Sequence, residues 1–213
     1  MKYASIDIET LGISLDVDTI EIGIVIDDLS DPKPLADLDR LRLLLRHNQM
    51  TGEPYALGMH CDSGLIKEMQ KYDRAAGPIV ELAKNEFLLQ SEVKDTFDVN
   101  SSSGQSHDVY DRAWRVVYEF LKKHDMHRQL KVAGKNFSTF DKPHLESKGW
   151  NIPFNIRFLD IGPLYMTDQI KKGRTWVPNL KQCLEYAGQE ETVSHKSIED
   201  ALDVIKCVRY KLL

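Results

Sequence analysis

The sequence predicts an α/β fold in which a mixed sheet carries helices on both faces. Three strand-like segments follow one another with short connections in residues 1–46. From residue 108 onward, short apolar segments alternate with amphipathic helical patterns. Strands that first run together and then alternate with helices are typical of a mixed sheet covered on both sides. At 213 residues, the chain is long enough for one domain with a sizeable core.

The first three strands are predicted from side-chain patterns. Residues 2–8 are mainly apolar, as expected for a strand covered on both sides. Residues 20–26 alternate large side chains with small or polar ones, and the short connection between these two strands favours an antiparallel pair. The alternation at 39–43 predicts a third strand within 38–46, although the leucine-rich composition would also suit a helix.

The region from residue 47 to residue 107 has the weakest pattern in the chain. It predicts helices near 63–72 and 78–89 and ends in a serine-rich loop at 100–104. We interpret 47–107 as an insertion or a cap within a single domain that spans residues 1–213.

The second half of the chain has regular patterns. Apolar residues recur at helical spacing between residues 108 and 124, which predicts an amphipathic helix. The further predicted elements are strands at 131–134 and 156–161 and helices at 141–149, 161–171, 179–187 and 197–211. Gly188 would end the third of these helices as a C-cap.

The composition leaves nucleic acid open as a ligand. The net charge is −5, but residues 1–107 hold 10 Lys and Arg against 19 Asp and Glu, a net −9, whereas residues 108–213 hold 18 against 14, a net +4. A basic face can bind a polyanion on a protein whose total charge is negative. Three widely spaced cysteines, no apolar run near the ~20 residues of a membrane span and no signal-peptide pattern predict a cytoplasmic protein without membrane association.

Asp7 and Glu9 form the first acidic motif. Residues i and i+2 of a strand share one face, so both carboxylates would lie on the same side of the first strand. Two such carboxylates repel each other in a poorly solvated setting, and a divalent cation with oxygen ligands would stabilise both as ions. Alternatively, the strand ends here and both side chains face water.

Asn136 and Asp141 form the second polar motif. They follow a strand directly, at the edge where open α/β sheets bind ligands. The Asn136 amide could tie the turn, and Asp141 could begin the next helix. The alternative role for Asp141 is that of an acid at a helix N-terminus, which stabilises the helix by ~0.3–1 kcal/mol.

His195 and Asp200 form the third motif. Asp200 falls early in the helix at 197–211, beside its apolar stripe, so its carboxylate would point near the core. Burying a carboxylate there is unfavourable unless it is paired or binds a metal. His195 precedes this helix on a loop, where an imidazole could take a proton from water. A lone histidine in such a place is otherwise an ordinary surface residue.

The three motifs together resemble those of the DEDDh exonucleases, the DnaQ-like group that includes oligoribonuclease, RNase T and polymerase proofreading subunits. The resemblance covers residues 1–30 and about 108–213. The tyrosine branch of this group would have Tyr-x3-Asp in the third motif, so His195 indicates the histidine branch. The matching motifs, in chain order, are Asp7-x-Glu9, Asn136-x-x-x-Phe140-Asp141 and His195-x-x-x-x-Asp200.

The resemblance implies a fold and an activity. The fold would be an RNase H-like sheet of five strands in the order 3-2-1-4-5, the first three antiparallel. The activity would be 3′→5′ removal of nucleoside 5′-monophosphates from the 3′ end of single-stranded RNA or DNA. Asp7, Glu9, Asp141 and Asp200 would hold two Mg²⁺ or Mn²⁺ ions, Asp7 bridging them, and His195 would act as the general base.

The resemblance also implies substrate contacts. It places Thr10 and Leu11 against the 3′-terminal nucleotide, although Leu11 would serve equally well as a core residue. Asn136 and Phe140 complete the predicted substrate-binding set; Phe140 or Phe137 could stack on a base, with packing beneath the helix as the alternative for at least one of them. The rival interpretations are an enzyme for short oligonucleotides and a nucleic-acid-binding protein without activity. A homodimer is plausible because several relatives form one.

Overall fold

The computed structural model describes residues 1–47, 49–71, 79–82, 86–88, 107–150, 158–189 and 193–213. Within these residues one sheet has seven strands in the order β5-β4-β3-β2-β1-β6-β7. The first five pair antiparallel with their neighbours, whereas β6 runs parallel to β1 and β7 runs parallel to β6. The strands are β1 (Lys2–Thr10), β2 (Thr19–Asp28), β3 (Arg40–Leu44), β4 (Ile79–Leu82), β5 (Glu86–Leu88), β6 (Val132–Gly134) and β7 (Leu159–Asp160).

The predicted five-stranded order is confirmed by β3-β2-β1-β6-β7, and two further strands extend it at the β3 edge. The helix predicted at 78–89 is wrong, because the described residues of that range form β4 and β5. Without β4, the outer edge of β3 would present unpaired backbone groups, and pairing with Ile79–Leu82 satisfies them. The β-branched pair Ile79 and Val80 also favours a strand.

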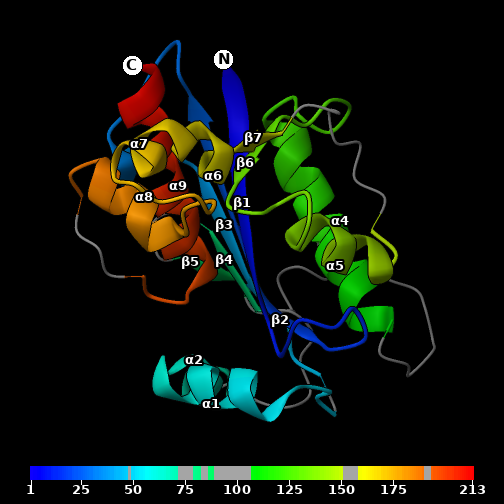
Figure 1. Ribbon diagram of the computed structural model, residues 1–213. Helices are drawn as coiled ribbons and strands as arrows, with labels where there is room; N and C mark the ends of the chain where they lie inside the picture. The colour runs from blue at the N-terminus through cyan, green and yellow to red at the C-terminus, as the bar shows by residue number, and fades with distance from the viewer. Residues whose placement is uncertain (48, 72–78, 83–85, 89–106, 151–157, 190–192) are drawn as a thin grey trace.

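Two helical layers cover the sheet, as Figure 1 shows. On one face lie α4 (His107–Lys123) and α5 (Asp141–Ser147); on the other lie α6 (Ile161–Leu164), α7 (Met166–Lys171), α8 (Leu180–Tyr186) and α9 (Ser197–Leu212). Beyond one end of the strands lie α1 (Pro54–Asp62) and α2 (Leu65–Met69), and a short 3-10 turn, η1 (Leu35–Asp37), precedes β3.

The predicted helices of the second half are confirmed, with boundaries that differ by at most two residues. The helix predicted at 161–171 is interrupted at Tyr165, which separates α6 from α7. Gly188 has a positive φ of 66° and follows the C-terminal end of α8, as predicted. The strand predicted at 156–161 is seen as β7; residues 156 and 157 lie outside the described part of the chain.

Side chains of β1 alternate between the two faces of the sheet, each of which is covered by a helical layer. Ile6 and Ile8 pack in the core beneath α4 and α5, whereas Tyr3 packs in the core formed with α8 and α9. Because side chains alternate along a strand, Asp7 and Glu9 share the Tyr3 face and project toward α9. The alternation therefore determines that α9, and not α4, can contact Asp7 and Glu9.

A third, smaller core attaches α2 to the sheet. Leu11, at the end of β1, packs there with Ile20 and Leu44 against three side chains of α2, namely Leu65, Ile66 and Met69. The α1–α2 segment is therefore positioned at the carboxyl end of β1. Among the described helices, none combines the length and apolar character needed to cross a membrane.

Candidate active site

Asp7 and Glu9 lie where β1 ends, on the face covered by α9. In the β1–β2 register, Asp7 lies opposite Gly23 and Glu9 lies opposite Glu21. The Glu9 side chain is buried, and Asp7 keeps partial exposure to solvent. The strand therefore brings both predicted carboxylates to one place.

Asp141 joins these acids from the first turn of α5. Its Oδ1 accepts a hydrogen bond from the Ile8 backbone nitrogen at 3.1 Å. Because β6 ends at Gly134, the Ile8 amide lies beyond the paired part of that edge, and the Asp141 carboxylate supplies the missing acceptor. The side chain is buried. Asp141 therefore connects the start of α5 to β1.

Asp200 and His195 approach from the start of α9. Asp200 is buried in the first turn, and the Ser194 hydroxyl donates to its Oδ1 at 3.4 Å. His195 is exposed and has a φ of 53°, a left-handed conformation that non-glycine residues seldom adopt. One ligand atom each from Glu9, His195 and Asp200 lies within 4.8 Å of the others.

Burial, together with nearby negative charges, raises the pKa values of all four carboxylates. Removal from water is the largest cause for Asp7, whose pKa is well above its ordinary value, followed by the charges of Asp141, Glu9 and Asp200. Burial, with the charge of Asp200 next, raises the pKa of Glu9 to about 9. Burial also raises the pKa values of Asp141 and Asp200 to about 7 each. Such a cluster cannot be fully ionised at neutral pH without a compensating cation.

A pocket of about 460 Å³ opens beside this cluster. One wall comes from α1 and the residue after it, and the other from the loop that precedes α9. His195 lines the pocket and also meets the acidic cluster, so it stands between the two. The lining residues are Pro54, Tyr55, Gly58, Met59, Asp62, Ser63, Ser194 and His195.

Thr10 and Leu11, two of the four predicted substrate-binding residues, have buried side chains. The Thr10 hydroxyl donates to the Gly12 carbonyl at 2.6 Å. Leu11 is 1% exposed and belongs to the core that attaches α2, so its packing role is observed directly. Their contact with a substrate stays a prediction.

Asn136 and Phe140 lie in the turn between β6 and α5. The Asn136 backbone carbonyl, and not its amide, ties this turn by accepting from the nitrogens of Thr139 and Phe140 at 2.9 Å each. Phe140 is partly buried, and its ring lies 4.6 Å from that of His144. Phe137 is fully buried in the core beneath α4 and α5, which matches the packing alternative for one of the two aromatic residues.

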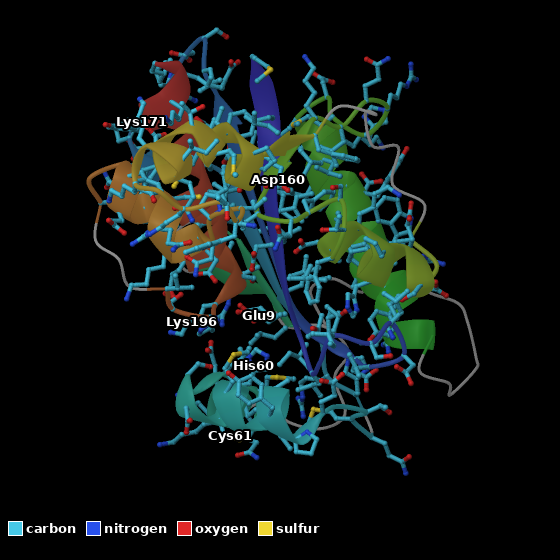
Figure 2. The ribbon with its side chains drawn as sticks, viewed as in Figure 1. Glu9, His60, Cys61, Asp160, Lys171 and Lys196 are labelled. Atoms are coloured by element: carbon cyan, nitrogen blue, oxygen red, sulfur yellow. The ribbon has the colours of Figure 1, made fainter. Side chains whose placement is uncertain are left out.

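His60 is a site residue that the sequence did not indicate. It lies on α1, fully buried, with Nε2 2.9 Å from the Thr10 carbonyl oxygen and 3.7 Å from Glu9 Oε2. Figure 2 shows His60 between α1 and Glu9, while Cys61 lies on the other side of the helix. Burial lowers the His60 pKa, and because a carbonyl can only accept, the neutral ring carries its proton on Nε2. His60 thereby links α1 to the acidic end of β1.

Glu21 and Gly23 on β2 also support the site. The Glu21 side chain is fully buried, and its Oε2 accepts from the Ser197 nitrogen, the first of α9, at 2.9 Å. A Cβ on Gly23 would lie 2.5 Å from the Ser197 carbonyl carbon, so only glycine allows α9 to begin this close to the sheet. The alternation of large with small or polar residues in 20–26 was the available signal, but it indicated a strand and not a contact.

Replacing Gly23 by alanine should displace the start of α9, and with it His195 and Asp200. The motifs predict hydrolysis of an oligonucleotide. We expect kcat/KM for this predicted reaction to fall by about tenfold or more, because misplacement of about 1 Å is enough to disturb catalytic geometry. Val25→Ala, on the same face of β2, is the matched control. It should lower the melting temperature through a cavity yet leave kcat/KM within about twofold. Equal activity in the two variants would contradict the role of Gly23.

The central strand order and the helices on both faces define an RNase H-like α/β fold. The chain is similar to a solved structure of exonuclease I, with a TM-score of 0.54 and 12% sequence identity over 99% of this chain and 41% of that chain. It is also similar to E. coli exonuclease I in complex with a dT13 oligonucleotide, with a TM-score of 0.53 and 11% identity over 98% of this chain and 40% of that chain.

This chain thus spans about 40% of the length of these two structural neighbours. At such low identity the similarity establishes the fold. No protein-family model matches the sequence, and no curated protein matches it.

Proposed function

We propose that this protein is a metal-dependent 3′→5′ exonuclease that shortens single-stranded RNA or DNA to nucleoside 5′-monophosphates. The observation that carries the proposal is the convergence of four carboxylates with an exposed histidine at the edge of a pocket. The motif order in the sequence supports it, as does the fold similarity to exonuclease I, one structure of which contains a dT13 oligonucleotide.

The residues of the cluster fit divalent metal ions. Carboxylate oxygens are the ligands that Mg²⁺ and Mn²⁺ prefer. The raised pKa values reflect burial first and then neighbouring negative charge, which a cation would neutralise. Asp7, Glu9, Asp141 and Asp200 would hold two such ions. When bound, the ions would lower the pKa of a coordinated water and stabilise the charge that develops on the phosphate.

The remaining roles belong to the side chains around the pocket. His195 is exposed beside Glu9 and Asp200, where it would accept the proton of the attacking water. The pocket volume of about 460 Å³ lies within the ~300–1,000 Å³ usual for small-molecule sites, which suits one terminal nucleotide better than a duplex. The 3′ end of a single strand would enter between α1 and the loop at Ser194.

Replacing His195 by glutamine should lower kcat by about 10²–10⁴-fold, the usual contribution of a general base. The affinity for Mn²⁺ should change much less, because the four carboxylates remain. The measurement is a single-turnover rate together with an Mn²⁺ titration of each protein. If the variant keeps the parental pH–rate profile, His195 is not the base.

The activity is tested with matched single-stranded DNA and RNA, labelled in turn at the 3′ and the 5′ end, with Mn²⁺ or with EDTA. We expect a metal-dependent ladder that shortens from the 3′ end and releases nucleoside 5′-monophosphates. A strong preference for the shortest substrates would indicate an enzyme for oligonucleotide remnants. Binding of the strands without cleavage, by folded protein with bound metal, would contradict the enzymatic proposal.

A further inference from the structure

We infer that Arg42 is a positioning residue that fixes the two walls of the pocket relative to each other. One wall belongs to the α1–α2 segment and the other to the loop that leads into α9. The inference rests on the proposed function of this pocket, since it concerns how a substrate is placed against His195.

Arg42 projects from β3 and joins two acids from different segments. Its Nε donates to Oε1 of Glu21, and its Nη1 and Nη2 donate to the two carboxylate oxygens of Glu68 at 2.6 Å and 3.0 Å. The Arg42 side chain is 12% exposed, and Glu21 is fully buried. One guanidinium therefore connects β2 and β3 to α2 within the protein interior.

The Glu21 end of this network holds the start of α9. Lys196, the N-cap residue, makes no side-chain capping hydrogen bond, and Glu21 Oε2 accepts from the Ser197 nitrogen instead. A carboxylate at this point satisfies an otherwise free helix donor and interacts favourably with the helix dipole. Ser194 and His195 lie just before Ser197. The hydrogen bond between Glu21 and the Ser197 nitrogen therefore fixes the position of this wall of the pocket.

The contact between Arg42 and Glu68 fixes the position of α2 and, with it, of the pocket wall formed by α1. Glu68 lies on α2, which follows α1 after only Ser63 and Gly64. The hydrogen bonding from Arg42 is the main reason that the Glu68 pKa lies below its ordinary value, and the charges of Arg42 and Lys196 contribute in the same direction. Lys196 lies beside the lower end of α9, facing α1, in Figure 2. Both walls of the pocket thus meet at the Arg42 network.

Lysine cannot replace this geometry. The guanidinium donates in two directions at once through a planar fork, whereas an ammonium group is a single point charge. We therefore expect Arg42→Lys to keep the charge next to Glu21 and to lose the paired contact with Glu68. The pocket walls would then separate in a protein that still folds.

Arg209 provides a matched control. Arg209 lies near the C-terminal end of α9, far from the pocket. It donates to both carboxylate oxygens of the fully buried Asp27 on β2, at 3.1 Å and 2.6 Å. Arg209→Lys should therefore cause a loss of stability comparable to that of Arg42→Lys without reaching the pocket. Glu68→Gln is a milder third variant, because it weakens only the ion pair that connects Arg42 to α2.

The experiment measures kcat and KM on a single-stranded oligonucleotide and, separately, amide hydrogen exchange. We expect Arg42→Lys to raise KM and lower kcat by about tenfold each, Glu68→Gln to raise KM with kcat within about twofold, and Arg209→Lys to change neither. In Arg42→Lys, exchange should accelerate in α2 and in the first turn of α9 together.

The exchange measurement does not depend on activity. If the parent protein hydrolyses no substrate, the proposed function fails, and coupled exchange in α2 and α9 still tests the link through Arg42. Equal kinetic effects of Arg42→Lys and Arg209→Lys would overturn the inference. Unchanged exchange at α2 or at the start of α9 in Arg42→Lys would overturn it as well.

Discussion

Asp7→Asn is expected to abolish hydrolysis and at the same time to stabilise the metal-free protein. The side chain stands among three other acids, whose charges, after burial, are the main cause of its raised pKa. Asparagine removes one carboxylate from this repulsive cluster and should raise the metal-free stability by about 1 kcal/mol. In the proposed function Asp7 is a metal ligand, so its replacement should lower the activity by more than the ~10–100-fold that loss of a supporting residue causes.

Asp27→Asn is the matched control for this prediction. Asp27 lies on the neighbouring strand and is buried, but it is paired with Arg209 and accepts from the Tyr3 hydroxyl at 2.7 Å. Removing its charge deprives the partly buried Arg209 of its ion partner, so stability should fall by ~1.5–3 kcal/mol. The two variants therefore shift the melting temperature in opposite directions. A fall in metal-free stability with Asp7→Asn would contradict the description of the cluster as a centre of repulsion.

The metal-free protein is expected to lose stability as the pH rises from about 4 to about 9. In the unfolded chain these carboxylates ionise near their ordinary pKa values of 3.8 and 4.5, whereas in the folded protein Asp141 and Asp200 have pKa values of about 7 and Glu9 about 9. Between these limits the folded state binds more protons than the unfolded state, so stability falls with rising pH. One pKa unit corresponds to ~1.4 kcal/mol for each group, so the decline over this range should amount to several kcal/mol.

Saturating Mg²⁺ or Mn²⁺ should reverse this dependence. The ions bind the ionised cluster of the folded state, and at about 100 times the dissociation constant they add ~2.7 kcal/mol. Urea unfolding at pH 6 and pH 9, with and without metal, measures both effects. A stability that rises with pH in the absence of metal would contradict the raised pKa values. Asp7→Asn should show a weaker pH dependence than the parent.

Much of the fold could be predicted because it rests on periodic burial. The apolar run of residues 2–8, the alternation in 20–26 and the apolar stripe of 108–124 each predicted an element that the structure contains. The prediction of a helix at 78–89 was wrong because short apolar runs suit a helix and a strand equally. The strand forms here because the edge of β3 offers backbone groups for pairing. That edge is a tertiary feature with no local signal.

The acidic residues could be predicted because each motif is local in sequence. Asp7 and Glu9 share a strand face, and Asp200 and His195 lie at the start of a helix, so residue type and spacing made them candidates. The resemblance of the three motifs together to those of the DEDDh exonucleases then singled them out. His60 could not be found in this way. It reaches Glu9 only because the core around Leu11 docks α2, and with it α1, at the end of β1.

The supporting residues were missed for the same physical reason. Glu21 and Gly23 look like the polar and small positions of an ordinary strand, and their importance comes from the distant Ser197 backbone. Arg42 looks like one of several charges in an alternating strand, although it joins two segments that are far apart in the sequence. Contacts between elements carry information that spacing within one element does not.

The most direct measurement is anomalous diffraction from crystals soaked with Mn²⁺ and a nucleoside 5′-monophosphate. The account predicts manganese peaks bounded by Asp7, Glu9, Asp141 and Asp200, with the nucleotide in the pocket between α1 and His195. The same soak of Asp7→Asn should lose at least one peak. Manganese found only elsewhere on the protein, with the four carboxylates unliganded, would contradict the metal site and with it the proposed hydrolysis.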